Sequence, residues 1–242
     1  MKRALIFGST GGIGQAIAKQ LAADGWSLYL HYDHNESAAQ KLQKKFSQKF
    51  PKQDFFTLKL SFLDSMKDIK DILATIFPVN ALIFAQGITD YNFLKDQDFA
   101  TIDKIMQVNL VVPIKIVSFL ENMLLKYDHS RIIFLGSVYG KQASALESVY
   151  SASKGGLSAF SKGYAREVAS SHLTVNVLAP GAVDTPMNNI FDQDTLDEVK
   201  SEIPAGRLAQ GSDVAYWVKT LLSEKADYLT GQTIYIDGGW LV

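Results

Sequence analysis

The chain contains no cysteine. It therefore forms no disulfide, no thiolate metal site and no cysteine nucleophile. Disulfides are rare in the reducing cytoplasm, so the absence fits the cytoplasmic localisation that we expect. The four histidines are scattered and show no metal-ligand spacing, so no metal site is predicted.

An excess of charge of either sign is also missing, because 24 lysines and arginines face 25 aspartates and glutamates. Nucleic acids and anionic membranes both require clustered basic surface, so we expect neither as a partner. No apolar run approaches the roughly 18 residues of a transmembrane helix. The first apolar run covers only residues 4–7, which is too short for a secretion signal.

What the chain does have is enough apolar material for a core, 47% of 242 residues. Seven short apolar runs alternate with longer amphipathic stretches, and such continuous runs are typical of buried parallel strands. The alternation predicts an α/β class fold, a single-domain Rossmann fold over residues 1–242 with a doubly wound parallel sheet of about seven strands flanked by helices. Strands are expected over residues 4–7, 27–32, 55–60, 81–84, 131–135, 174–178 and 233–236, and helices over 12–24, 36–49, 65–77, 101–126, 149–170 and 213–222.

The longest stretch without a strand pattern runs from residue 182 to residue 210. It contains Pro186 and Pro204 and an acidic helical pattern over residues 192–202. Loops of this length inside compact domains are often lids over a site. We therefore expect residues 182–210 to form a substrate loop.

The first expected strand runs directly into a glycine-rich turn, Gly-Ser-Thr-Gly-Gly-Ile-Gly over residues 8–14, and a helical pattern follows. Glycines let the backbone turn sharply and approach a pyrophosphate, and the helix N-terminus offers N–H donors to the anion. The spacing differs from the common G-x-G-x-x-G. Taken alone, the turn leaves a plain tight connection open as an alternative.

Tyr150 and Lys154 stand four residues apart in an expected helix and so share one face. A lysine cation beside the phenol is expected to bring the tyrosine pKa of about 10 towards the range of efficient proton transfer. Such a pair also arises by chance on amphipathic helices. Ser137 favours the functional interpretation, because it follows an expected strand and ligands of doubly wound sheets bind at the carboxyl ends of strands.

Together these residues resemble the short-chain dehydrogenase/reductase family, and the resemblance covers essentially the whole chain. It is carried by the glycine turn and by five further motifs, which are Val108-Asn109, Gly136-Ser137, Tyr150-x3-Lys154, Pro180-Gly181 and Asp237-Gly238-Gly239. The resemblance implies a nicotinamide-dependent ketone reductase, and the family is usually homotetrameric.

The resemblance also implies roles for individual residues. Ser137 would orient the carbonyl, Tyr150 would donate the proton, Lys154 would bind the nicotinamide ribose and tune Tyr150, and Asn109 would hold a proton-relay water. Substrate contacts are expected from Ser137, Glu147 and Tyr150. The expected cofactor contacts are Gly8, Ser9, Thr10, Gly12, Ile13, Gly14, Asp33, Gly87, Tyr150, Lys154, Pro180, Gly181, Val183 and Thr185.

The chain departs from the family pattern at two places. Residues 84–87 read Phe-Ala-Gln-Gly where the family usually has Asn-Asn-Ala-Gly, and Phe7 replaces a threonine before the first glycine. The adenosine side of the cofactor site must therefore be rearranged.

The cofactor preference rests on few residues. Asp33 lies one place beyond the expected position of an NAD-type acid, and Gly11 stands where many NADP enzymes carry a basic residue. We expect NADPH, with NADH as the alternative. His31 and His34 are expected at the surface.

Two branches of the family offer substrates. The 3-oxoacyl-acyl-carrier-protein reductases dock an acidic carrier through basic residues at positions that are Asp128 and Ser171 here. Nearby Lys126, Arg131 and Arg166 are candidates to replace them.

The elongation factor P 5-aminopentanone reductases resemble the chain more closely in residues 143–152, 181–185 and 202–204. Their substrate carries an amine, with which Glu147 would pair through a charge-assisted bond. The alternative for Glu147 is a cap on the catalytic helix. A hypothesis of another functional class is that the protein is a regulator that binds the cofactor without catalysis. The presence of all four catalytic residue types argues against it; these are Asn109, Ser137, Tyr150 and Lys154.

Overall fold

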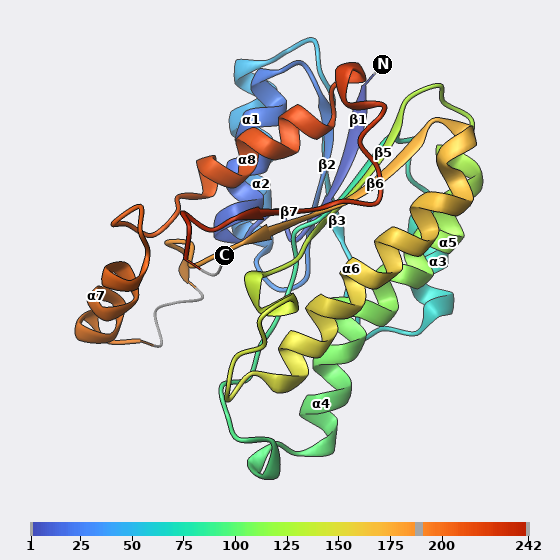
Figure 1. Cartoon of the computed structure of the whole chain (residues 1–242). Coiled ribbons are helices and arrows are strands. Elements are labelled where there is room, and N and C mark those ends of the chain that lie inside the picture. The colour runs from blue at the N-terminus through green and yellow to red at the C-terminus, as the bar shows by residue number, and fades with distance from the viewer. Residues whose placement is uncertain (1, 187–190, 241–242) are drawn as a thin grey trace.

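The sheet determines the architecture of the computed structural model, which describes residues 2–186 and 191–240. Seven parallel strands form one sheet in the order β3-β2-β1-β4-β5-β6-β7 (Figure 1). This order confirms the predicted doubly wound fold. The sequence of strands along the sheet changes direction between β1 and β4, and doubly wound folds bind ligands at this point. The strands are β1 (Arg3–Phe7), β2 (Ser27–Tyr32), β3 (Phe55–Lys59), β4 (Ala81–Phe84), β5 (Ser130–Leu135), β6 (Leu173–Pro180) and β7 (Thr233–Ile236).

Helices cover both faces of the sheet, with α1, α2 and α8 on one side and α3, α4, α5 and α6 on the other (Figure 1). Their bounds are α1 (Gly12–Ala23), α2 (Glu36–Lys49), α3 (Met66–Leu73), α4 (Phe99–Met106), α5 (Val112–Leu124), α6 (Ser148–Val168), α7 (Gln193–Glu202) and α8 (Gly211–Leu221). Short 3-10 helices are η1 (Leu94–Asp96), η3 (Val138–Gly140), η4 (Ala169–Ser171) and η6 (Glu224–Ala226), and η2 (Gln107–Val111) is a π-helical turn. Within the described residues, no helix combines the length and apolarity needed to cross a membrane.

Two apolar cores follow from the alternation of side chains along each strand. Leu5 and Phe7 of β1 belong to the core beneath α5 and α6, while Ala4 and Ile6 belong to the core beneath α1 and α8. Both faces of β1 are fully buried. This is why the strand reads as a continuous apolar run and was predictable from the sequence.

The helix predicted over residues 101–126 is wrong as one element. The chain instead forms α4, the π-helical turn η2 and α5 in succession. A π turn widens the helix by one residue without interrupting its apolar face, so the pattern alone does not reveal it. Pro113 lies in the first turn of α5 and, having no N–H, donates no backbone hydrogen bond to the preceding turn η2. The turn η2 carries Asn109.

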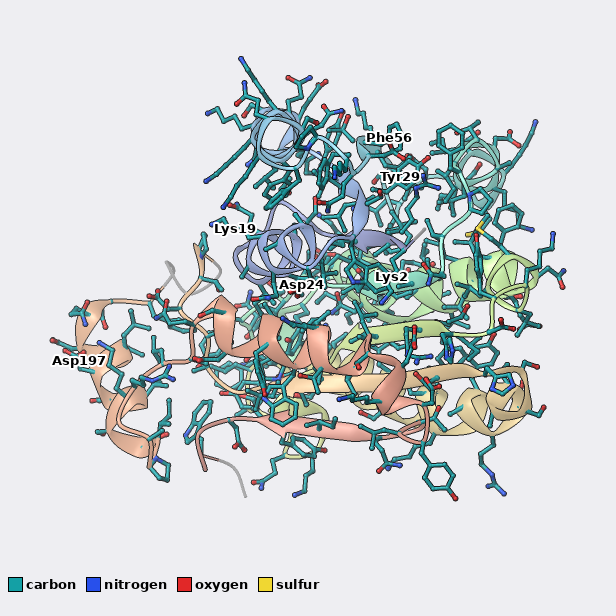
Figure 2. The ribbon with its side chains drawn as sticks, turned by 90° about the horizontal axis from the view of Figure 1, so that it is seen from above. Lys2, Lys19, Asp24, Tyr29, Phe56 and Asp197 are labelled. Carbon is teal, nitrogen blue, oxygen red and sulfur yellow. The ribbon has the colours of Figure 1, made fainter. Side chains whose placement is uncertain are left out.

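Helix α7 projects from the body of the molecule, as both views show (Figures 1 and 2). It has no buried residue, and Asp197 on it points away from the rest of the chain (Figure 2). The indole N–H of Trp240 donates to Glu202 at 3.1 Å and joins the end of α7 to the C-terminal segment. The helix lies within the loop predicted over residues 182–210.

Candidate active site

The turn between β1 and α1 is compact and leaves no room for side chains. Gly8 has φ +71°, and a Cβ on Gly14 would lie 2.1 Å from the carbonyl oxygen of Gly8. The N-cap of α1 is Gly11, which has no side chain to satisfy the first amides, and the first turn contains no acidic residue. These open N–H groups fit the pyrophosphate of a dinucleotide.

His31, at the end of β2, holds this turn in place. Its Nδ1 accepts from the amide of Gly8 at 2.9 Å, so Nε2 carries the proton and donates to the carbonyl of Leu60 at 2.9 Å. His31 is 3% exposed, so the expectation that it lies at the surface is wrong, whereas the His34 side chain is 92% exposed. Burial lowers the pKa of His31 to about 4, although its bond to Leu60 acts in the opposite direction.

The buried neutral imidazole makes stability depend on pH. The unfolded chain binds a proton at His31 below pH 6.5 and the folded chain only below about 4. The folded state therefore loses stability as pH falls through this window, by up to about 3 kcal/mol. We expect urea unfolding between pH 7.5 and 4.5 to show a shallower pH slope in His31→Gln than in the wild type.

His34→Gln is the matched control, because His34 is exposed, and its slope should equal that of the wild type. An unchanged slope in His31→Gln would show that His31 is not the titrating group.

Ser137, Tyr150 and Lys154 come together at the carboxyl end of β5. Ser137 follows the strand, and its hydroxyl forms a hydrogen bond with the phenol of Tyr150. Lys154 is 3% exposed, and its ammonium donates to the carbonyl of Leu135 at 2.7 Å. The Lys154 Nζ lies 5.6 Å from the centre of the Tyr150 ring. The three residues that the sequence singled out thus share one site.

The predicted lowering of the Tyr150 pKa is not what the structure has. Burial raises the pKa of Tyr150 to about 12, while the Ser137 hydrogen bond acts against this rise. Burial also lowers the pKa of Lys154 to about 8. Burial is the largest cause of the Tyr150 shift, and the charge of Glu147 acts in the same direction, so the phenol keeps its proton at neutral pH.

Asn109 supports this site from the π-helical turn η2. Its Oδ1 accepts from the amide of Ile88 at 2.9 Å, and its Nδ2 donates to the Ile88 carbonyl at 2.8 Å and to Ser153 Oγ at 3.1 Å. A Cβ on Gly87 would lie 3.2 Å from Lys154 Nζ and 3.6 Å from Asn109 Oδ1. The side-chain amide of Asn109 thus fixes the loop after β4 beside Lys154.

The remaining predicted cofactor residues surround the same edge of the sheet. A Cβ on Gly12 would lie 2.7 Å from Thr185 Cγ2, so the glycine turn meets the loop after β6. Ser9 is fully buried, and its hydroxyl donates to the carbonyl of His31. Asp33 lies further out and accepts from the Ser61 hydroxyl at 3.3 Å.

Gln86 was noted in the sequence only as a departure, and its Oε1 is buried without a hydrogen-bond partner. No group of three or more histidine, cysteine, aspartate or glutamate residues that could hold a metal occurs in the described part of the chain.

A cavity of about 260 Å³ opens beside Tyr150 and Ser137. Ile13, Pro180, Gly181, Val183 and Thr185 contribute to its wall, as does the α7 face with Leu196 and Val199. Among the described residues that line it, Glu147 alone carries a formal charge. The sequence analysis missed four aromatic lining residues, which are Tyr91, Tyr139, Phe191 and Trp240.

Glu147 lies at the N-terminal end of α6 and turns its carboxylate to the cavity. Its side chain makes no capping hydrogen bond with α6 and instead accepts from the hydroxyl of Thr89 at 2.7 Å. Glu147 is therefore the N-cap residue of α6, as the alternative interpretation had it, but its side chain is not used as a cap and is available to the cavity. Burial raises the pKa of this carboxyl, against the effect of the Thr89 bond. A cation in the cavity would offset the cost of that burial.

Comparison with known proteins identifies similar chains. A family model described as enoyl-(acyl carrier protein) reductase matches residues 8–241. The chain is 37% identical over 240 residues to the uncharacterized oxidoreductase YmfI of Bacillus subtilis (strain 168), covering 99% of this chain and 98% of that protein. It is 34% identical over 241 residues to the 3-oxoacyl-[acyl-carrier-protein] reductase FabG of Escherichia coli (strain K12), covering 98% and 96%.

Solved structures are also similar. A dehydrogenase/reductase from Sinorhizobium meliloti 1021 has a TM-score of 0.90 at 28% identity, covering all of this chain and 95% of the other. A 3-oxoacyl-[acyl-carrier protein] reductase from Brucella melitensis ATCC 23457 has a TM-score of 0.92 and covers 100% and 91%, and at 22% identity it is evidence of the shared fold alone.

Proposed function

The chain belongs to the short-chain dehydrogenase/reductase family and is an NAD(P)-dependent oxidoreductase, and we propose that it reduces a ketone with Tyr150 as proton donor. The observation that carries this proposal is the position of the Tyr150 phenol, bonded to Ser137, at the wall of a cavity. Ile13 of the glycine turn and Thr185 line the same cavity. A ketone there lies between the proton donor and the dinucleotide cradle.

The glycine turn and Lys154 would hold the nicotinamide cofactor, and its chemistry would be the supply of a hydride for the carbonyl carbon. The Ser137 hydroxyl donates a hydrogen bond that orients the ketone oxygen, and Tyr150 transfers its proton to that oxygen. The ammonium of Lys154, 5.6 Å from the ring centre, stabilises the phenolate that remains. Asn109 holds the loop after β4 beside this group through its bonds to Ile88.

We propose NADPH as the cofactor, with NADH as the alternative. An acid that binds the NAD ribose needs a free carboxylate oxygen. The Oδ2 of Asp33 already accepts from Ser61 and lies 3.4 Å from His34 Nε2. Among the described residues nothing occupies the Oδ1 of Asp33, so this carboxylate fits either cofactor and the choice of NADPH rests on the family resemblance.

The substrate that we propose is the 5-aminopentanone group on elongation factor P, which carries an amine beside its ketone. Glu147 supports this choice, because its carboxylate is the single formal charge among the described lining residues. It lies one helical turn before Tyr150, so an ammonium bonded to Glu147 and a ketone bonded to Tyr150 fit one short chain. A fully apolar substrate would cover the carboxylate and leave it without a cationic partner.

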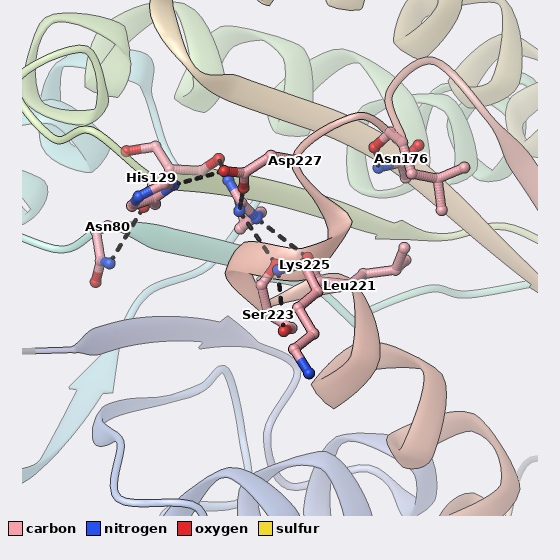
Figure 3. A network of polar contacts seen from close by, with 10 residues as sticks. Asn80, His129, Asn176, Leu221, Ser223, Lys225 and Asp227 are labelled. Atoms are coloured by element: carbon pink, nitrogen blue, oxygen red, sulfur yellow. Dashed lines mark hydrogen bonds and ion pairs between the residues drawn. The ribbon is translucent and has the colours of Figure 1, made fainter.

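The second candidate is a 3-oxoacyl-acyl-carrier-protein reductase, which the names of FabG relatives favour. Arg131 is 1% exposed and cannot dock an acidic carrier, so the interpretation of Arg131 as a docking residue is wrong. Its guanidinium donates to the carbonyls of Leu221 and Ser223 and pairs with Asp227, which also contacts His129 (Figure 3). Of the three candidates, only Lys126 and Arg166 remain exposed.

The two substrates respond differently to removal of one charge. We expect Glu147→Gln to lower kcat/KM by ten- to a hundredfold for aminoketone-modified elongation factor P, because a charge-assisted bond is lost. Acetoacetyl-carrier thioester should change less than threefold, since it carries no ammonium. Initial rates of NADPH oxidation measure both.

Equal losses on the two substrates would argue against amine pairing. Thr89→Ser serves as the control, because it keeps the hydroxyl that bonds Glu147. A wild-type protein that binds NADPH but reduces no ketone in a broad panel would instead support the hypothesis of a non-catalytic, cofactor-binding regulator.

We further propose that the protein acts in the cytoplasm as a homotetramer and that residues 182–210 form its substrate loop. The absence of cysteine supports the cytoplasmic localisation. Exposed aromatic side chains on α8 and β7, Tyr216, Trp217 and Tyr235, support burial of that face between copies. Thr195, Leu196 and Val199 of α7 line the cavity, which supports the loop assignment.

A further inference from the structure

Four aromatic rings from separate segments line the cavity with Glu147. Tyr91 follows β4, Tyr139 lies in η3, Phe191 precedes α7 and Trp240 comes from the C-terminal segment. They form two pairs: the rings of Tyr91 and Phe191 lie 5.5 Å apart at 89°, and those of Tyr139 and Trp240 lie 6.0 Å apart at 58°.

One of these rings, that of Tyr139, interacts electrostatically with the Glu147 carboxylate, which lines the same cavity. Burial raises the pKa of Tyr139, and the negative charge of Glu147 raises it further. Tyr91 also raises the pKa of Tyr139, and the Glu147 charge acts on Tyr150 as well. Glu147, Tyr139 and the proton donor therefore lie within electrostatic reach of one another.

The rings of Tyr139 and Trp240 are held in place by groups outside the cavity. The Trp240 indole donates to Glu202 at 3.1 Å, so its polar edge points to α7. The backbone before it turns through Gly238 and Gly239, both at positive φ. Tyr139 follows the Ser137 turn, and Ser144 forms a hydrogen bond with its phenol. Fixed rings can serve as a recognition surface, because little side-chain entropy is lost when a ligand binds.

We propose that Tyr91, Tyr139 and Trp240 form, with Glu147, an aromatic cage for the ammonium end of the substrate. This inference rests on the proposed function and deepens it, since it assigns the residues that recognise the amine. Aromatic faces carry partial negative charge and attract a cation, most strongly where water is excluded. Glu147 supplies the full charge, and the rings select against neutral ends of the same size.

Other chemistries fit this lining less well. Among the described residues of the wall there is no lysine or arginine, so a carboxylate or phosphate would have no cationic partner. A purely apolar role for the rings would leave Glu147 buried beside an apolar ligand, at a cost in desolvation. The cation is the ligand class that satisfies both features.

The test compares a small aminoketone with an uncharged analogue in which a methyl group replaces the ammonium. The selectivity ratio is kcat/KM for the aminoketone divided by kcat/KM for the analogue. We expect Tyr139→Leu and Trp240→Leu each to lower this ratio about tenfold, because the cation loses one ring face. The ring-retaining controls Tyr139→Phe and Trp240→Phe should change it less than threefold.

The ratio separates the two proposals, because a general loss of fold or cofactor binding affects both substrates alike and cancels. A wild type without preference for the aminoketone would overturn the substrate class and the cage together. If Glu147→Gln removes the preference and both leucine variants retain it, the cage is wrong and the substrate class stands.

Discussion

Tyr150→Phe is expected to lower kcat for ketone reduction by about 10²–10⁴-fold, the usual contribution of a positioned proton donor. The variant keeps the ring that fills the site and removes only the hydroxyl that bonds Ser137. The burial that raises the Tyr150 pKa to about 12 keeps the phenol in its protonated form at neutral pH in the wild type. NADPH oxidation with a saturating ketone measures kcat, and fluorescence titration with NADPH should show that the variant still binds the cofactor.

Tyr164→Phe is the matched control, because Tyr164 lies on the same helix α6 and is also largely buried. Its hydroxyl donates to Glu121 at 2.8 Å on a different side of the molecule from the cavity lining. We expect its kcat to equal that of the wild type. Turnover in Tyr150→Phe at the level of this control would exclude the proposed mechanism.

Gly14→Ala is expected to abolish cofactor binding within the range of a titration, with Kd raised at least a hundredfold. The new Cβ would lie 2.1 Å from the carbonyl oxygen of Gly8 and 2.9 Å from its carbonyl carbon. Both are backbone atoms, so the turn must open to make room. The N–H groups at the start of α1 then no longer point towards the pyrophosphate. Crowding in a packed site also costs typically about 1–3 kcal/mol of folding free energy. Isothermal titration with NADPH and urea unfolding measure the two effects.

Gly163→Ala provides the control in a helix without crowding. A Cβ on Gly163 of α6 meets no atom within 4 Å. Alanine favours a helix over glycine by about 1 kcal/mol, so this variant should be slightly more stable and bind NADPH normally. Normal NADPH affinity in Gly14→Ala would show that the turn does not hold the cofactor.

The fold was largely predictable because the local pattern and the tertiary environment agree. Strands β2, β4 and β7 begin and end where the sequence predicts, since both their faces are covered or their ends are marked by glycine and polar residues. The failure at η2 has a physical cause. A π turn preserves the apolar face of the helix, so the hydrophobic pattern does not mark its position. The nearest proline, Pro113, comes after the turn and does not mark it either.

The departures from the family pattern became intelligible only in three dimensions. Phe7 and Phe84 stand far apart in the sequence, yet their rings stack at 4.7 Å across β1 and β4, and Phe134 of β5 continues the stack at 4.9 Å. The ring of His31 meets Phe7 edge-on at 5.2 Å. One aromatic cluster thus accounts for both substitutions and for a histidine that was expected at the surface.

The positions of the proton donor and its partners were predicted through motifs, which fix spacing along one helix or one turn. The cavity wall was not, because Tyr91, Tyr139 and Trp240 come from three distant segments. No periodicity links such residues, and each taken alone is an ordinary aromatic side chain. Glu147 is the exception, since its three-residue distance from Tyr150 was visible in the sequence.

Because α7 is sparsely attached, we expect its local opening to be faster than the global unfolding of the sheet. The helix buries no residue, so its detachment exposes little apolar surface and leaves the parallel sheet intact. Amide protons of α7 should then exchange with solvent through local opening that is nearly independent of urea, while those of β1 and β4 exchange only on global unfolding. If residues 182–210 form the proposed substrate loop, we expect ligand exchange at the cavity to proceed without unfolding of the core.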